Sequence, residues 1–429
     1  MVLRTRKESE LMNHRLLRKR FAKRFLALTA ATVLSCAAVN AKPVMLVDAP
    51  ISRLLVNVAA YVKQHPQDSN GYYTLGRIHY FAFAAPTRQT MPVIRYNDKA
   101  LPYTSVLGNP GRIVAGARSS DDKATQTPDQ RKNHVQAAIR NLQQAIRLEQ
   151  RRPAADELKR DGLSELTLAC VYEEGKHDAA AIWQEEAIRY YRRAYERSSA
   201  QELKEPRTPF LGVQTLVSYE AAQSYLHLVR LRGVRPDEKK TVAAVEQTVK
   251  RLASLPPSNV VTPLIFSLNR ARPLSMLVAS RPEGVAFDLD GSARAGQVYG
   301  AWPRADTGIL VWDPTHTGQI TSGRQLFGNA TWWIFWENGY RALQSLDDDQ
   351  DGWLTAKELD NLGVWNDVNV NGKCESGEVR PLSQTGIVGL NVREAQPAGR
   401  GWVCKNGLRL QNGTVLPTYD WTVNTISAK

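Results

Sequence analysis

The sequence has 429 residues and a formal net charge of +14, with 56 Lys and Arg against 42 Asp and Glu. The charge is unevenly distributed: residues 1–41 hold nine basic and two acidic residues, whereas residues 284–395 hold 15 acidic and eight basic residues. A basic excess can indicate nucleic-acid binding. Here the basic residues of the middle of the chain are dispersed arginines without a basic–aromatic motif, so we expect solvated helix faces and no nucleic-acid partner.

Residues 1–41 have the features of a signal peptide. A basic stretch precedes an apolar run at residues 25–39, and residues 39–41 have the pattern of a signal-peptidase site. The apolar run is too short for a permanent membrane helix. We therefore predict export to the periplasm or the extracellular space. Residues 33–36 resemble a bacterial lipoprotein box, so we expect membrane contact only if Cys36 carries lipid.

Helices are expected in two stretches after this leader. The periodicity of apolar residues predicts a helical hairpin over residues 51–66 and 70–83, and further helices over residues 136–256. Residues 84–135 lie between these stretches, are rich in Pro, Gly, Thr and charge, and lack a helical period. This composition favours a flexible insertion.

The helices resemble tetratricopeptide repeats, whose second helix carries a small residue, a large residue four positions later and another small residue three positions after that. The pattern occurs twice, as Ala138, Leu142 and Ala145 and as Ala187, Tyr191 and Ala194. Small residues let paired helices approach closely, so that stacked repeats bury a continuous core. The two motifs are 49 residues apart, against a period of about 34 in regular arrays. The array would therefore be degenerate, and an ordinary helical bundle is the alternative.

Two twelve-residue stretches in the acidic region have the pattern of an EF-hand calcium loop. Residues 347–358 and 367–378 each have oxygen side chains at positions 1, 3 and 5, glycine at position 6 and glutamate at position 12. Glycine allows the sharp turn at position 6, and the glutamate closes the coordination sphere with two oxygens. One such stretch could be a solvated acidic turn, but two in tandem predict Ca²⁺ as a bound cofactor.

The predicted ligands stand at positions 1, 3, 5, 7, 9 and 12 of the two loops, with position 7 contributing its main-chain carbonyl. In the first loop they are Asp347, Asp349, Asp351, Trp353, Thr355 and Glu358. In the second loop they are Asp367, Asn369, Asn371, Lys373, Glu375 and Glu378. Because the second loop has Asn at positions 3 and 5, we expect it to bind Ca²⁺ more weakly. The short stretch between the loops predicts one short helix, with Leu362 and Trp365 facing a shared core.

Two further acidic turns look like decayed versions of the same loop. The turn at Asp288 loses its oxygen side chains after Asp290, and the turn at Asp313 has Arg324 where the closing acid should stand. Too little negative charge remains in either to replace the hydration of calcium, so we expect structural turns.

The tail of the chain alternates polar and apolar residues around an Asn-Gly turn, which predicts a β-hairpin in residues 396–429. Cys374 and Cys404 could form a disulfide, which an exported protein permits. The alternative is that Cys374, at position 8 of the second loop, is buried in a β-contact between loops.

The motifs of residues 285–392 follow a recognisable order. A Phe-Asp-Leu-Asp-Gly segment at residues 287–291 precedes Trp302, the first loop, Trp365 and the second loop. This order resembles the calcium-binding self-processing module of iron-regulated RTX-type exoproteins of Gram-negative bacteria. The resemblance implies an exported, calcium-dependent fold, and it raises autocatalysis, since such modules cleave an Asp-Pro bond just ahead of this segment. This chain has Arg-Pro-Glu at residues 281–283, without the required aspartate.

Together these patterns predict a mainly α protein, with an N-terminal helical-repeat array followed by an α+β EF-hand domain with short strands. The expected divisions are a signal peptide (1–41), a helical hairpin (42–83), an insertion (84–135), a helical domain with a bridging segment (136–283), a calcium-binding domain (284–395) and a hairpin tail (396–429). The expected function is that of an exported, non-enzymatic calcium-binding protein whose helical repeats bind another protein. The alternatives are a calcium-dependent self-processing module and a dockerin-like module for calcium-dependent adhesion or assembly.

Overall fold

The computed structural model describes residues 47–84, 90–91, 127–153, 162–175, 180–204, 217–254, 260–291 and 298–426. The expected signal peptide, Cys36 and most of the expected insertion lie outside these residues. All described residues belong to one compact unit of the chain, Met45–Lys429. None of the described helices has both the length and the apolar character needed to cross a membrane.

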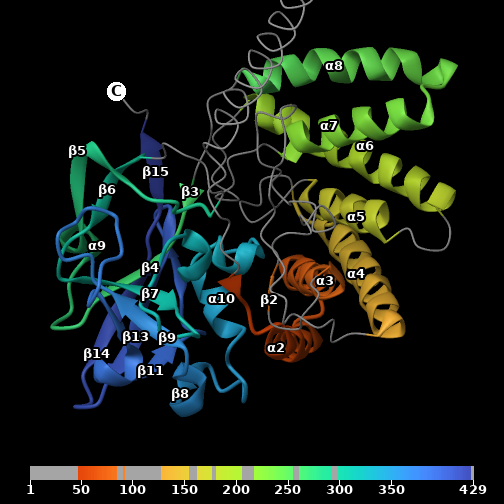
Figure 1. Ribbon diagram of the computed structural model, residues 1–429. Helices are drawn as coiled ribbons and strands as arrows, with labels where there is room; N and C mark the ends of the chain where they lie inside the picture. Colours follow the sequence, from red (N-terminus) through yellow and green to blue (C-terminus); the bar gives the residue numbers. More distant parts are fainter. Residues whose placement is uncertain are drawn as a thin grey trace, which may run out of the picture. The chain divides into compact units, whose positions relative to one another are not determined.

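The first part of the described chain is a layer of helices, which we call the helical layer. Its members are α2 (Ile51–Gln64), α3 (Ser69–Ala84), α4 (Pro128–Glu149), α5 (Leu163–Glu174), α6 (Ala180–Lys204), α7 (Val217–Arg232) and α8 (Lys239–Ala253), with a 3-10 turn at Pro236–Glu238. Helices adjacent in sequence pack against each other, as Figure 1 shows for α5 to α8. Helix α4 begins at a capping box in which the side chains of Thr127 and Gln130 satisfy each other's backbone N–H, with Pro128 at the first helical position.

The small residues of the two repeat-like motifs lie where helices meet. Ala138, Leu142, Ala145, Ala187, Tyr191 and Ala194 are all buried. Gly76 of α3 lies so close to α4 that an added Cβ would be 2.7 Å from the Leu142 side chain. Close packing of α3 on α4 therefore depends on glycine here. Whether the array is a true set of tetratricopeptide repeats stays a prediction.

Residues 260–426, which we call the C-terminal module, are built on antiparallel sheet. The main sheet has nine strands in the order β10-β9-β7-β4-β14-β13-β11-β8, with β12 paired to β13. Its strands are β4 (Leu264–Ser267), β7 (Thr307–Trp312), β8 (Trp353–Thr355), β9 (Leu362–Trp365), β10 (Val379–Pro381), β11 (Ile387–Asn391), β12 (Gln396–Ala398), β13 (Gly401–Leu410) and β14 (Val415–Asp420). A second sheet has the order β3-β15-β6-β5, with β3 (Val260–Val261), β5 (Val278–Ala286), β6 (Val298–Pro303) and β15 (Val423–Ile426).

Short elements complete the described chain. Strands β1 (Val47–Asp48) and β2 (Thr90–Met91) form an isolated pair. The module also has helices α9 (Leu274–Leu277) and α10 (Gly339–Gln344) and 3-10 turns η3 (Gly323–Gln325), η4 (Thr331–Trp333), η5 (Ala356–Leu359) and η6 (Leu382–Gln384).

The predicted fold class is wrong. The module is not an EF-hand domain with short strands, because a nine-stranded antiparallel sheet forms its framework. The reason lies in the central strands: every residue of β4, β7 and β9 is buried. Strands buried on both faces appear in the sequence as short continuous apolar runs, which periodicity cannot distinguish from buried helix.

The segment between the two acidic loops also differs from the prediction. No helix longer than the four-residue turn η5 joins the loops, and the chain then enters strand β9. Side chains alternate across a strand. Leu362 accordingly belongs to one hydrophobic cluster and Trp365 to the other, so they do not face a shared core.

The predicted terminal hairpin is present, but it is part of the main sheet. Strands β13 and β14 pair around Asn412-Gly413, and Gly413 has a φ of 84°, which glycine adopts readily. Cys374 and Cys404 are free thiols. Cys404 lies in one hydrophobic cluster and Cys374 packs against the other, so the two sulfurs are not joined.

One hydrophobic cluster runs through both the helical layer and the module. It includes residues of α2 to α8 together with strands β4, β7, β9, β11 and β13. Arg77 of α3 is fully buried at this junction, and its Nε and Nη2 donate to the main-chain oxygen of Trp333 at 3.0 and 2.8 Å. Its guanidinium lies over the rings of Phe81 and Phe335 at 4.6 and 4.4 Å. The two parts are therefore joined by a common core.

Candidate calcium-binding loops

The first loop, residues 347–358, follows α10 and brings three aspartates together. Asp347, Asp349 and Asp351 each offer a carboxylate oxygen, and these oxygens lie within 4.8 Å of one another. Asp349 and Asp351 are exposed, whereas Asp347 is only 2% exposed. One oxygen of Asp347 accepts the Gly352 N–H at 3.1 Å, and the other, Oδ1, is buried and accepts no hydrogen bond from the described residues.

A buried carboxylate oxygen without a donor is costly and needs an explanation. Burial raises the pKa of Asp347 from 3.8 to about 6; the N–H groups of Gly352 and Gln350 oppose the rise, and the charges of Glu358 and Asp351 add to it. A divalent cation at this point would remove both costs, because it supplies the missing partner and offsets the repulsion among the carboxylates. The first loop therefore fits a hard, oxygen-binding cation.

The second loop, residues 367–378, is held more tightly by its own hydrogen bonds. Asp367 is 1% exposed, and its carboxylate accepts N–H groups from Gly372 and the Trp302 indole, each at 2.7 Å. Its other oxygen accepts the Asn371 N–H at 3.1 Å. The side-chain amides of Asn369 and Asn371 both donate to Glu375 at position 9. The side-chain oxygens available to a metal in the second loop resemble those of the first loop, but they carry less negative charge.

The closing glutamates of both loops are already turned inward. Glu358 accepts the N–H of Asp348 at 2.6 Å and that of Thr355 at 2.9 Å. Glu378 accepts the N–H groups of positions 2 and 9 of its own loop in the same way, at 2.9 and 3.0 Å. In both loops, the position-7 N–H also donates to the side chain at position 5, at 2.7 Å. Two loops of different sequence thus share one hydrogen-bond pattern.

The backbone conformation repeats as well, and it repeats three times. Positions 4 and 6 have positive φ in the first loop, in the second loop and in the turn that starts at Asp313. The residues are Gln350 (60°) and Gly352 (94°), Val370 (58°) and Gly372 (71°), and His316 (50°) and Gly318 (64°). A β-branched residue such as Val370 rarely adopts positive φ, and such strain clusters at functional sites. The common backbone indicates that all three segments are versions of one loop.

The Asp313 turn keeps the loop shape without the ligands. Asp313 accepts the N–H groups of Thr317 and Gly318 at 3.1 and 2.8 Å. Arg324, at its twelfth position, is buried with its guanidinium 3.9 Å from the centre of the Trp333 ring. Burial lowers the pKa of Arg324 to about 10, and the nearby charges of Asp288 and Asp290 oppose this shift. A fixed positive charge therefore lies beside the acids of the other decayed turn.

The loops do not pair as the sequence suggests. Leu354, at position 8 of the first loop, pairs with Leu390 of β11. Cys374, at position 8 of the second loop, contacts the Asp313 turn, and its thiol donates to the main-chain oxygen of Gly318 at 3.1 Å. The Asp313 turn could be recognised in the sequence, but its position beside the second loop could not. The apolar Ile320 at its eighth position was the available signal.

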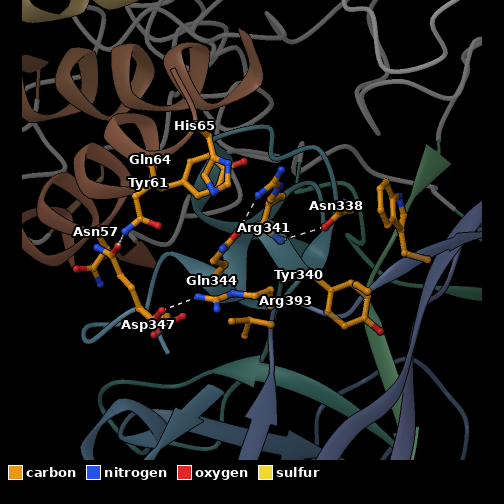
Figure 2. Close-up of a pocket in the computed structure, with 14 residues that line it drawn as sticks. Asn57, Tyr61, Gln64, His65, Asn338, Tyr340, Arg341, Gln344, Asp347 and Arg393 are labelled. Atoms are coloured by element: carbon orange, nitrogen blue, oxygen red, sulfur yellow. Dashed lines mark hydrogen bonds between the residues drawn. The ribbon is translucent and has the colours of Figure 1, made fainter. Parts of the chain in front are cut away.

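Helix α2 also contributes residues that sequence analysis missed. A cavity of about 520 Å³ lies between α2 and the segments around the first loop. Figure 2 shows Asn57, Tyr61 and Gln64 of α2, with His65 just after the helix, on one side. On the other side it shows Asn338, Tyr340, Arg341, Gln344, Asp347 and Arg393. The buried Asp347 thus lines a space whose other wall comes from the helical layer.

Comparison with known proteins supports the resemblance seen in the order of motifs. Residues 264–416 match the family model of the SPM domain. A stretch of 96 residues is 36% identical to the iron-regulated protein FrpA of Neisseria meningitidis serogroup C. This stretch is 21% of the chain and covers only 9% of that protein. The C-terminal module is therefore similar to the self-processing modules of RTX-type exoproteins, and the likeness is consistent with export.

Proposed function

We propose that the protein is an exported calcium-binding protein whose C-terminal module binds Ca²⁺ in the loops at residues 347–358 and 367–378. The observation that carries this proposal is the buried Oδ1 of Asp347, which forms no hydrogen bond with the described residues and lies beside two further aspartates. The shared backbone and the inward-turned glutamates support the same reading for the second loop. The ligands are those expected from the sequence at positions 1, 3, 5, 7, 9 and 12.

The first loop should be the stronger site. It has carboxylates at positions 1, 3, 5 and 12, whereas the second has carboxylates at positions 1, 9 and 12 with amides at 3 and 5. Extracellular calcium modules have dissociation constants of roughly 10⁻⁴–10⁻³ M. At such affinities, Ca²⁺ would occupy the module after export and stabilise it, because a ligand that binds only the folded state raises stability.

Calorimetry with a matched pair of variants tests the assignment. Glu358→Gln removes a charge and one metal-binding oxygen, and should weaken the first site by more than the roughly 10–100-fold loss typical of outer-shell partners. Asp360→Asn removes the same charge from an exposed residue just beyond the loop and should leave both sites nearly unchanged. Two unaltered sites in Glu358→Gln would contradict the proposal.

We also infer that the chain does not cleave itself and is not an enzyme. Its one Asp-Pro bond is Asp313-Pro314. The Asp313 carboxylate accepts two main-chain N–H groups within its turn, and these bonds stabilise the resting carboxylate over one that attacks its own carbonyl. Intact mass spectrometry after incubation with Ca²⁺ should show a single unchanged species. Fragments ending at Asp313 would favour a self-processing module instead.

The partner is proposed to be another protein that binds the helical layer. Pull-down experiments with the exported chain, with and without Ca²⁺, test this partner. Capture that is unaffected by chelator supports binding by the helices, whereas capture only in Ca²⁺ favours a dockerin-like assembly module.

A further inference from the structure

Helix α2 contacts the residues on both sides of the first proposed calcium ligand, Asp347. Arg53 Nε lies 2.7 Å from Asp348 Oδ1, immediately after Asp347. Its Nη2 donates to the main-chain oxygen of Leu346, immediately before Asp347, at 2.5 Å. One arginine of the helical layer therefore holds the residues that flank the buried aspartate.

Asn57, one turn further along α2, makes a second contact of the same kind with a neutral side chain. Its Nδ2 donates to the main-chain oxygen of Ser345 at 3.0 Å and to Asp348 Oδ1 at 2.7 Å. Asn57 is buried. Near the end of α2, Gln64 also donates to the side chain of Gln350, at position 4 of the loop. The contact thus extends along the whole helix.

The second loop offers an internal comparison. Within the described part of the chain, its side chains and main chain bond to partners inside the C-terminal module, such as Trp302 and Gly318, and not to the helical layer. Any effect of Ca²⁺ on α2 should therefore come from the first loop alone.

We propose that Ca²⁺ in the first loop stabilises the contact of helix α2, and with it the start of the helical layer, with the C-terminal module. This coupling rests on the proposed calcium binding. Without the cation, three carboxylates within 4.8 Å of one another repel, and the loop opens at the residues that α2 contacts. With the cation, Ser345 to Asp348 are held in place and α2 has a fixed surface to bind. Coupling between two binding events is reciprocal, so docked α2 also raises the affinity of the first loop for Ca²⁺.

Hydrogen exchange of the full chain measures the coupling directly. Ca²⁺ should slow amide exchange in α2 by about 5-fold or more, the lower end of common coupling factors. The same slowing should be present in Glu378→Gln, which damages the second loop, and absent in Glu358→Gln, which damages the first. Equal slowing in both variants would overturn the proposal.

A variant on the other side of the contact gives an independent measurement. Asn57→Ala removes two hydrogen bonds without changing charge, and should weaken calcium binding at the first loop by about 5-fold while leaving the second unchanged. Val56→Ala, at a residue of the same helix that is 68% exposed, is the control and should change neither site.

Calorimetry on the same samples separates the two proposals. If the first loop binds Ca²⁺ and α2 exchange does not respond, the coupling is refuted and the proposed function stands. If wild-type protein binds no Ca²⁺, both are refuted.

Discussion

Replacing Asp420 by Asn should change how the stability of the protein depends on pH. Asp420 is the last residue of strand β14 and is 1% exposed. One of its carboxylate oxygens lies close to Gly339, 3.0 Å from the position that a Cβ would take there. Burial raises its pKa from 3.8 to about 8, opposed only in part by two neutral groups, the Gly339 N–H and the Thr262 hydroxyl. Between these two pH values the folded state holds a proton that the unfolded chain has lost.

This difference in bound protons sets the direction and the size of the change in stability with pH. Because the folded state binds more protons than the unfolded state, the free energy of unfolding falls as pH rises from about 4 to 8, by about 1.4 kcal/mol per pH unit from this group. The amide introduced by Asp420→Asn does not titrate, so the variant should gain about 3 kcal/mol relative to wild type between pH 5 and pH 7. Other titrating groups contribute equally to both proteins and cancel in the difference.

Urea unfolding of both proteins at pH 5, 6 and 7 in constant chelator measures this difference. Asp360→Asn, which removes an exposed acid, serves as the control for replacing Asp by Asn. A free-energy difference for Asp420→Asn that is independent of pH would show that Asp420 does not hold its proton in the folded state.

Three further changes have defined outcomes. Burial and the nearby His134 and Arg140 lower the pKa of His79 from 6.5 to about 4, so the free energy of unfolding decreases as pH falls through this range. His79→Phe should reduce the decrease between pH 7 and pH 4.5, measured by urea unfolding, by about 2 kcal/mol. An equal decrease in both proteins would exclude this role. Trp353 is the proposed position-7 residue, whose carbonyl would bind the ion, so excitation of its indole should sensitise terbium bound in the first loop. Trp353→Leu should remove most of that luminescence and leave calcium affinity near normal in calorimetry, whereas undiminished luminescence would mean that the loop register is wrong. Val370→Gly should relieve the strain of its positive φ and raise the free energy of unfolding in chelator, measured by urea unfolding, by about 1 kcal/mol, and a clear decrease would argue against strain.

The local chemistry of the loops could be predicted from sequence because the residues that define them are adjacent in the chain. Alternating oxygens, a glycine at position 6 and a glutamate at position 12 are properties of one short segment. Glu358 indeed folds back on its own loop, to Asp348 and Thr355. Helices with a clear apolar period, such as α2 and α3, could be predicted for the same reason.

The sheet and the surroundings of the loops could not be predicted, because they depend on contacts between distant residues. Strand β7 lies between β4 and β9 with all six residues buried, so its apolar run carries no alternation that would identify a strand. Arg53 and Asp348 are 295 positions apart, and neither has a sequence pattern that points to the other. Only the folded chain brings them together.

The pairing of β4 with β14 has a consequence for how the protein reaches its folded state. Strand β4 at residues 264–267 completes its hydrogen bonding only when residues 418–420 of β14 are available, and β15 likewise pairs with β3 across the module. Closing such long stretches of chain costs entropy before it yields contacts, which makes this kind of sheet slow to form. A chain that is still being synthesised cannot finish this sheet before residue 420 is available. We therefore expect the module to close in a late, cooperative step.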